Sequence, residues 1–280
     1  MNYLKTALLL GLLAGLFIIA GYSVAGPEGA AMGLILAFIM NFFAYWGSDK
    51  IVLRMFKAQQ ISPDSGLYHT VQELAMKAQM PMPKVYVMND PAPNAFATGR
   101  NPEHGAVVFS TGLLDMMSKE ELQGVAAHEL SHIKHRDILI STIAATIAGA
   151  ISFIANMAMW VGMTGGHRNN GNNSNPFVMI LVMLLAPVAA AIIQMSVSRS
   201  REYEADRGGA EICGNPLYLA NALQKLGNYK QAPRADFNQA TAHMFIVNPL
   251  KGGSVANLFS THPPLEERIK RLQSMNKIGI

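Results

Sequence analysis

In the segment AAHELSHIKHRD, residues 126–137, two of the three histidines and the glutamate have a spacing that suits a metal site on a helix. His128 and His132 are four residues apart, so on a helix they share one face, with Cβ atoms about 5–6 Å apart. Glu129 projects about a quarter turn away, where it would reach a metal-bound water without binding the metal itself. This pattern is typical of metal-assisted hydrolysis, in which a carboxylate takes a proton from water. Two ordinary surface histidines are the alternative.

The acidic segment SRSREYEADRGGA, residues 198–210, offers the third ligand that a catalytic zinc ion needs beside water. On a helix, Glu202 and Asp206 share a face and Glu204 points roughly the other way. We favour Glu202 as the ligand. Asp206 would then accept a hydrogen bond from a histidine ring and fix its tautomer. The alternative is a charged helix face whose acids pair with neighbouring arginines, Arg199, Arg201 and Arg207.

Four blocks that are almost free of charge must position these residues, and they lie at about 6–26, 30–46, 138–163 and 177–197. The chain is 50% hydrophobic and only 14% charged, well below the roughly 25% charge of a soluble domain. Each block approaches the ~20 apolar residues that cross a bilayer as a helix. We therefore predict a membrane protein with four transmembrane helices in two hairpins, 1–46 and 138–197. A buried core helix at 30–46 and a cleaved signal peptide at 6–26 are the alternatives.

The basic residues predict the orientation. The loop between the first two blocks has no lysine or arginine, whereas several lie near the other ends of the blocks: Lys50, Arg54, Lys57, Lys134, Arg136, Arg199 and Arg201. The positive-inside bias places that side, with both chain ends, in the cytoplasm. The net charge of +4 then reflects topology, and we expect no nucleic-acid partner. The single cysteine, Cys213, allows no intrachain disulfide, which suits a reducing compartment.

The hydrophilic segments 47–137 and 198–280 are predicted to form one α+β unit in two parts. Ser118 and Glu121 form a capping-box pattern that opens a helix through the histidine motif and unbroken into block 138–163. The charges of 134–137 are costly in hydrocarbon, so the motif should lie at the membrane surface rather than inside it. Other expected elements are helices at 63–79, 216–227 and 262–275 and strands at 84–90, 94–99 and 105–111.

The motifs HELSH, REYEAD and THPPLEER, with four hydrophobic blocks in this order, resemble the HtpX family of membrane zinc metalloproteases, relatives of the CAAX prenyl endopeptidases. The resemblance covers essentially the whole chain. It implies a cytosolic α+β zincin-like (gluzincin) protease domain built from two segments, with one Zn²⁺ per chain. It also implies the residue roles: His128, His132 and Glu202 as ligands, Glu129 as general base and Asp206 as the partner that orients His128.

The same resemblance implies endoproteolysis of misfolded or damaged membrane proteins, as quality control and stress response in the bacterial inner membrane. The partners would be membrane-protein or unfolded polypeptide substrates and the lipid bilayer. His262, in THPP, would lie near the metal and stabilise a developing oxyanion; a helix N-terminal residue is the alternative. Asn94, in NAFATG, would contact substrate beside an edge strand to which an extended peptide can pair. A simple turn residue is the alternative there.

Two rival functions are weaker. A non-catalytic membrane scaffold or chaperone could keep zinc structurally, but closed structural sites usually take four ligands, often cysteines, and this chain has one cysteine. A transporter would place acids or bases inside the apolar blocks to mark an ion path, and these blocks carry none.

Overall fold

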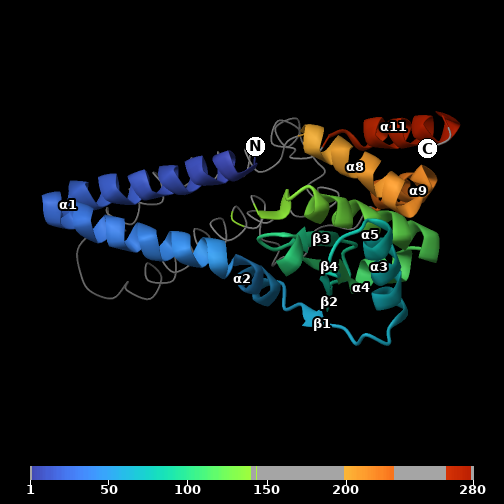
Figure 1. Ribbon diagram of the computed structural model, residues 1–280, viewed down its shortest axis with the longest axis horizontal. Helices are drawn as coiled ribbons and strands as arrows, with labels where there is room; N and C mark the ends of the chain where they lie inside the picture. Colours follow the sequence, from blue (N-terminus) through green and yellow to red (C-terminus); the bar gives the residue numbers. More distant parts are fainter. Residues whose placement is uncertain (1, 140–142, 144–198, 230–262, 279–280) are drawn as a thin grey trace, which may run out of the picture.

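The computed structural model describes residues 2–139, 143, 199–229 and 263–278 of the 280-residue chain. It shows a long helical hairpin beside a compact α+β unit (Figure 1). The predicted blocks 138–163 and 177–197 fall almost entirely outside the described residues, and so does His262. Membrane crossing by those two blocks, and a role for His262, therefore stay predictions.

The helical hairpin is α1 (Asn2–Trp46). Its two arms run antiparallel (Figure 1) and reverse direction at Gly26, whose φ of 59° lies in the left-handed region, just before Pro27. Within the described residues, one stretch is long and apolar enough to cross a membrane, Gly26–Phe43. It contains most of the predicted block 30–46. The first arm adopts the expected helix, and its membrane crossing stays a prediction.

Small residues bring the two arms of α1 together. A Cβ atom on Gly33 would collide with the carbonyl oxygen of Phe17, so only glycine permits this approach. Ala37, one turn further on, is fully buried. Asn41 completes the row by donating its side-chain amide to the carbonyl oxygen of Leu10 at 3.1 Å. Small residues four apart are the usual means by which helices pack closely in membranes.

The sheet of the α+β unit has the strand order β1-β2-β4-β3. β2 and β4 are parallel, while β1 and β3 run antiparallel to their neighbours. The last strand, β3, pairs Ala95 with Phe109 and Thr98 with Ala106. The three predicted strands are confirmed in position. The bounds are β1 (Gln59–Gln60), β2 (Lys84–Met88), β3 (Ala95–Thr98) and β4 (Ala106–Ser110).

Helices cover both faces of the sheet, and alternate side chains of β3 pack into two different hydrophobic clusters. Its Ala95 and Ala97 belong to the main core, while Phe96, pointing the other way, joins a smaller cluster with Val52 of α2. The main core lies between the sheet and the helices on its other face. The helical bounds are α2 (Ser48–Met55), α3 (Gly66–Lys77), the 3-10 turn η1 (Pro102–His104), α4 (Thr111–Met116), α5 (Lys119–Lys134), α8 (Arg199–Cys213), α9 (Pro216–Asn228) and α11 (Leu265–Ile278).

The helix that carries the histidine motif, α5, begins as predicted. The Ser118 hydroxyl accepts a hydrogen bond from the Glu121 backbone amide, and the Glu121 carboxylate accepts one from the Ser118 amide, which completes the capping box. Lys225 of α9 pairs with the same carboxylate at 2.7 Å. The start of the helix with the histidine motif is thus tied to the second half of the chain.

The end of α5 differs from the sequence prediction. The helix ends at Lys134, so the expectation of an unbroken helix into block 138–163 is wrong. Arg136 adopts a φ of 60°, and the amides of Arg136 and Asp137 bond back to the carbonyls of Ile133 and His132, each at 3.0 Å. These two bonds close a helix end of the kind that usually has glycine at the left-handed position. An arginine there gives no sequence signal.

Candidate metal centre

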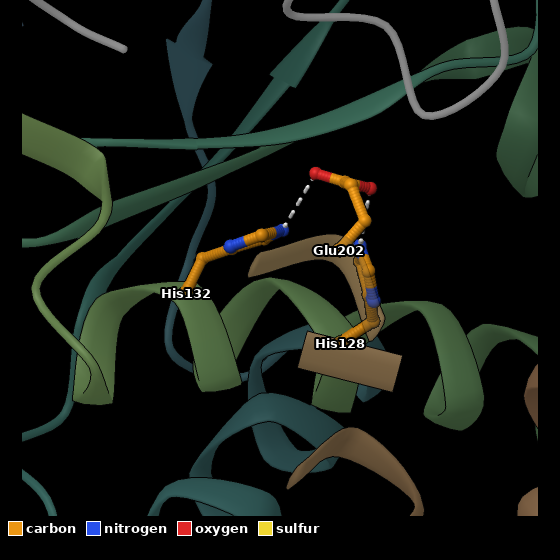
Figure 2. A group of neighbouring side chains, drawn as sticks. All are labelled: His128, His132 and Glu202. Atoms are coloured by element: carbon orange, nitrogen blue, oxygen red, sulfur yellow. Dashed lines mark ion pairs between the residues drawn. The ribbon is translucent and has the colours of Figure 1, made fainter. Parts of the chain in front are cut away.

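Three side chains from two helices meet above α5. Figure 2 shows the imidazoles of His128 and His132 rising from one side of α5, with the Glu202 carboxylate reaching them from α8. Glu202 Oε2 lies 3.9 Å from His128 Nε2, and Oε1 lies 3.5 Å from His132 Nε2. One donor atom from each residue falls within 4.8 Å of the others. The three predicted ligands are therefore brought together.

This donor set fits a zinc ion. Ligand bonds of about 2.1 Å in a tetrahedron put neighbouring donors about 3.4 Å apart. Glu202 approaches the two rings through different oxygens, at 3.5 and 3.9 Å, and one donor atom from each residue lies within 4.8 Å of the others, so the side chains are near that spacing. Two nitrogens, one carboxylate and no thiolate also match the ligand set of catalytic rather than structural zinc sites.

Each histidine has a carboxylate at its other ring nitrogen. His128 Nδ1 lies 3.0 Å from Asp206 Oδ1, as predicted, and His132 Nδ1 lies 3.5 Å from Asp137 Oδ2. A carboxylate in this position favours the tautomer with hydrogen on Nδ1, which leaves the Nε2 lone pair directed at the centre. No sequence pattern assigns Asp137 this position, because only the turn after α5 folds it back beside His132.

A fully buried arginine from the C-terminal helix supports this arrangement. Arg268 donates from Nε to Asp206 Oδ2 at 2.8 Å and from Nη2 to Oδ1 at 2.7 Å. Its Nη1 lies 3.5 Å from Glu202 Oε2. Burial alone would raise the pKa of Asp206, but the charge and hydrogen bonds of Arg268, with those of His128, lower it to about 2. Asp206 therefore stays ionised. The motif THPPLEER contains Arg268, but nothing in the sequence marks it as buried.

The electrostatics of the centre favour a cation. Burial opposes the charged form of His132, yet its hydrogen bond with Asp137 and the negative charges of Glu202 and Glu129 raise its pKa to about 9. Without metal, a proton therefore occupies a site that a metal ion would otherwise hold. Glu129 is 4% exposed, and its charge also helps to raise the pKa of Arg268. The predicted base thus lies within electrostatic reach of a ligand and of the buried arginine.

The charged segment 198–210 divides between site and surface. Glu202 and Arg201 are buried, with Arg201 Nη1 4.0 Å from Asp137 Oδ1. Glu204 is exposed, and Arg207 pairs with Glu211 at the surface. The alternative of a solvated charged face thus holds only for the outer side of α8. The burial of Arg201 was not expected.

Two adjacent glycines let α8 approach α5 closely. A Cβ on Gly209 would lie 2.9 Å from both the Cα and the amide nitrogen of His128, nearer than side chains normally come to backbone. A Cβ on Gly208 would collide with the hydroxyl of Ser131. The distance between the two metal-bearing helices therefore depends on the absence of side chains here. In the sequence, the one signal for this close approach is the position of the GG pair just after REYEAD.

Asn94 lies immediately before β3 and is fully buried. Its backbone amide donates to the Ser110 hydroxyl at 2.8 Å, and its carbonyl accepts from the Ser110 amide at 2.9 Å. These bonds fix the start of β3, the strand at the edge of the sheet. The predicted substrate contact by Asn94 stays a prediction, as does the role of His262.

A helix that packs on a sheet and presents two imidazoles, faced by a carboxylate from a second helix, is the arrangement expected of a metal-dependent peptidase. Peptidase family M48 matches residues 62–276, which include every element of that centre. The chain belongs to this family and, within it, to the HtpX family. It is a metalloprotease, a hydrolase that acts on polypeptides with a divalent metal.

Relatives named "Protease HtpX homolog" match almost the full length. That of Paraburkholderia phytofirmans is 54% identical over 283 residues, covering 99% of this chain and 98% of the relative. That of Syntrophotalea carbinolica is 53% identical over 278 residues, covering 98% and 99%. The crystal structure of S. mikatae Ste24p is similar in fold, with a TM-score of 0.53 at 19% identity. That match covers 97% of this chain, which spans 65% of the Ste24p chain.

Proposed function

We propose that this metalloprotease is a zinc-dependent endopeptidase embedded in the bacterial inner membrane, where it cleaves misfolded or damaged membrane proteins at the cytoplasmic face. The observation that carries the proposal is the convergence of His128, His132 and Glu202, with one donor atom each within 4.8 Å of the others. In an M48 chain, this set is the natural place for the catalytic ion.

The chain's own residues divide the catalytic work. His128, His132 and Glu202 hold zinc, which supplies Lewis-acid polarisation of water and of the substrate carbonyl. Glu129 takes the proton of the attacking water and delivers it to the leaving amine. Asp206 and Asp137 hold the two imidazoles in the required tautomer through contacts of 3.0 and 3.5 Å.

The substrate lies beside β3, which ends the strand order of the sheet. An extended peptide adds to such a strand through backbone hydrogen bonds, which accept many side chains and suit unfolded polypeptides. Asn94 fixes the start of this strand and lies next to the bound peptide. His262, three residues before the start of α11 in the sequence, stabilises the oxyanion that forms when the peptide bond is attacked.

Membrane proteins are the preferred substrates because the protease is itself held in the bilayer. Four spans form two hairpins, 1–46 and 138–197, and the protease domain is built from 47–137 and 198–280. The exposed apolar side chains of the second α1 arm support this placement, with Met32 74% and Phe38 72% exposed. Such a surface is costly in water and favourable in lipid.

The test compares the wild type with Glu129→Ala and His128→Ala in one membrane preparation. Glu129→Ala should retain about one zinc per chain, but its cleavage rate should fall at least about 10²-fold because only the base is lost. His128→Ala should lose both zinc and cleavage. Zinc is measured by elemental analysis, and cleavage with casein and with a membrane-protein substrate, each with and without a chelator.

His104→Ala is the matched control. His104 is an exposed histidine bonded to Asn101, so its removal should change neither zinc content nor rate. Cleavage by Glu129→Ala at the wild-type rate would contradict the assigned base. A wild type that binds zinc but cuts nothing would instead support the non-catalytic scaffold.

A further inference from the structure

The second arm of α1 runs into α2 with hardly a break. The amide of Gly47 donates to the carbonyl of Phe43 at 2.9 Å, and the amide of Ile51 donates to the carbonyl of Gly47 at 2.9 Å. Helical hydrogen bonding therefore bridges the junction between α1 and α2. The two helices follow one another along nearly the same course (Figure 1). A displacement of the arm is accordingly transmitted to α2.

α2 is fixed in turn to the face of the sheet opposite α5. Val52 is fully buried in a cluster with Met88, Val108 and Phe96. The ring of Phe56, which follows α2, lies 4.8 Å from the ring of Phe96, centroid to centroid. Phe96 belongs to β3, so this aromatic contact joins the apolar hairpin to the strand beside the metal centre.

A second contact joins the hairpin to the other end of β3. The guanidinium of Arg100 lies 4.7 Å from the centre of the Trp46 ring, the last residue of α1. Between β3 and Arg100, Gly99 adopts a φ of 135°, and a Cβ there would collide with the carbonyl oxygen of His104. Only glycine makes this turn without strain. Trp46 follows the apolar stretch that ends at Phe43, a position where tryptophan favours the membrane–water interface.

We propose that the first hairpin, with α2, acts as a spacer that holds β3 at a fixed height above the bilayer. The Trp46–Arg100 contact is the exposed part of this spacer, so a substitution can remove it. Both residues position β3, beside which the substrate lies, and neither takes part in the reaction. A substrate anchored in the same bilayer and paired with β3 then reaches the metal centre only at a set distance from its anchor. An extended chain advances about 3.3 Å per residue. A change of that size in the height of β3 above the bilayer would therefore move the cleavage position by one residue. This inference rests on the proposed function.

The experiment maps cut positions in a reporter with one membrane helix followed by an unstructured polar tail, reconstituted with the full-length zinc enzyme in liposomes. Mass spectrometry of the products should show the wild type cutting within a narrow window of the tail. Arg100→Ala should raise the fraction of cuts outside that window about two- to fivefold, the ratio expected for loss of one exposed cation–π contact. Arg100→Lys, which keeps a cation over the ring, should restore the narrow window.

Two controls separate positioning from general damage. Casein has no membrane anchor, so Arg100→Ala should cut it at the wild-type rate. Arg54→Ala also removes one positive charge, from an exposed arginine of α2. If the loss of charge alone has no effect, this variant should cut the reporter within the same window as the wild type. An unchanged window in Arg100→Ala, and in Arg100→Ala combined with Phe56→Leu, would overturn the spacer. Equal loss of casein and reporter cleavage would overturn it too. Failure of the wild type to cut either substrate would refute the proposed function itself.

Discussion

Each histidine ring of the metal centre has a carboxylate near each of its two nitrogens. Glu202 faces the Nε2 atoms, while Asp206 and Asp137 face the Nδ1 atoms of His128 and His132. The arrangement makes the rings good metal ligands, but in the metal-free protein it also makes His132 a strong base. Proton and zinc therefore compete for one nitrogen.

Zinc binding should accordingly strengthen as the pH rises. Because the pKa of His132 is raised to about 9, its proton must leave before zinc binds at neutral pH. The apparent zinc affinity of the metal-free protein should increase about tenfold per pH unit up to about pH 9 and then level off. Asp137 is a main cause of the raised pKa of His132. Asp137→Asn should therefore lower the levelling point, which is the pH above which the zinc affinity no longer increases. Competition with a chromogenic chelator across pH measures both.

The exposed Asp115 supplies the control, since Asp115→Asn also removes one negative charge and should leave the levelling point in place. A zinc affinity that is flat between pH 6 and 9, after correction for the chelator, would contradict the raised pKa of His132.

At the scale of single residues, much of the centre could be predicted from the sequence. HELSH and REYEAD each place their groups within one or two helical turns, so residue type and helical periodicity together selected His128, His132, Glu202 and Asp206, and the family resemblance implied which acid would be the ligand. Asp137 and Arg268 could not be found in this way. Asp137 depends on a turn that arginine rarely makes, and Arg268 on a contact with Asp206 across 62 residues of chain.

At the scale of elements, the closeness of α5 and α8 decides whether ligands from two helices can share one ion. The Gly208–Gly209 pair sets that distance because any side chain at Gly209 would press on the backbone of His128. Interiors are close-packed, so an added methyl group cannot be absorbed without shifting one helix.

Gly209→Ala should therefore separate the ligands. We expect a loss of about 1–3 kcal/mol in stability from overpacking, with a fall in zinc affinity of about tenfold or more as Glu202 is displaced from the imidazoles. Thermal unfolding in detergent and zinc competition measure the two effects. Gly66→Ala is the control, because Gly66 begins α3 and a Cβ there meets nothing within 4 Å. Equal zinc affinity in both variants would show that the glycine pair does not set the ligand distance.

The sequence predicted the elements well where local signals were strong. Ser118 and Glu121 marked the start of α5, and the predicted helix at 216–227 is confirmed as α9, where the Asn215 side chain accepts a hydrogen bond from the Leu217 amide. It failed at the end of α5, because apolar residues after the motif suggested continuation and the left-handed residue is arginine. The order of the strands, with β3 last, also depends on pairing that no single strand encodes.

At the scale of the whole molecule, the centre is assembled from three distant parts of the chain. α5 provides two ligands, α8 provides Glu202 and Asp206, and α11 provides the cation between those acids. Arg268 is fully buried and bonds Asp206 through two nitrogens. A buried acid left without its cation is strongly destabilising.

Arg268→Met should therefore cost about 3–5 kcal/mol, because it leaves the Asp206 charge buried without its main partner. The melting temperature in detergent should fall by many degrees. Adding Asp206→Asn to Arg268→Met should restore part of that stability by removing the unpaired charge. The measurement is thermal unfolding of the metal-free proteins, so that zinc binding does not mask the difference.

Arg271→Ala is the comparison within α11. Arg271 is about half exposed, pairs with Glu267 and lies 3.7 Å from the centre of the Tyr203 ring, so its loss should lower the melting temperature far less than Arg268→Met does. A similar, small effect for Arg268→Met would mean that the buried pair with Asp206 does not hold α11 against the centre.

The order of synthesis gives the position of Arg268 a further consequence. Translation delivers HELSH well before Glu202, and Glu202 well before Arg268. Domains complete their folding once their last packed segment has left the ribosome. A chain made only as far as α5 therefore has Glu129 and the two imidazoles but lacks both the Glu202 carboxylate that faces them and the Arg268 cation that pairs with Asp206, so we expect it to hold no catalytic metal until α8 and α11 have been made.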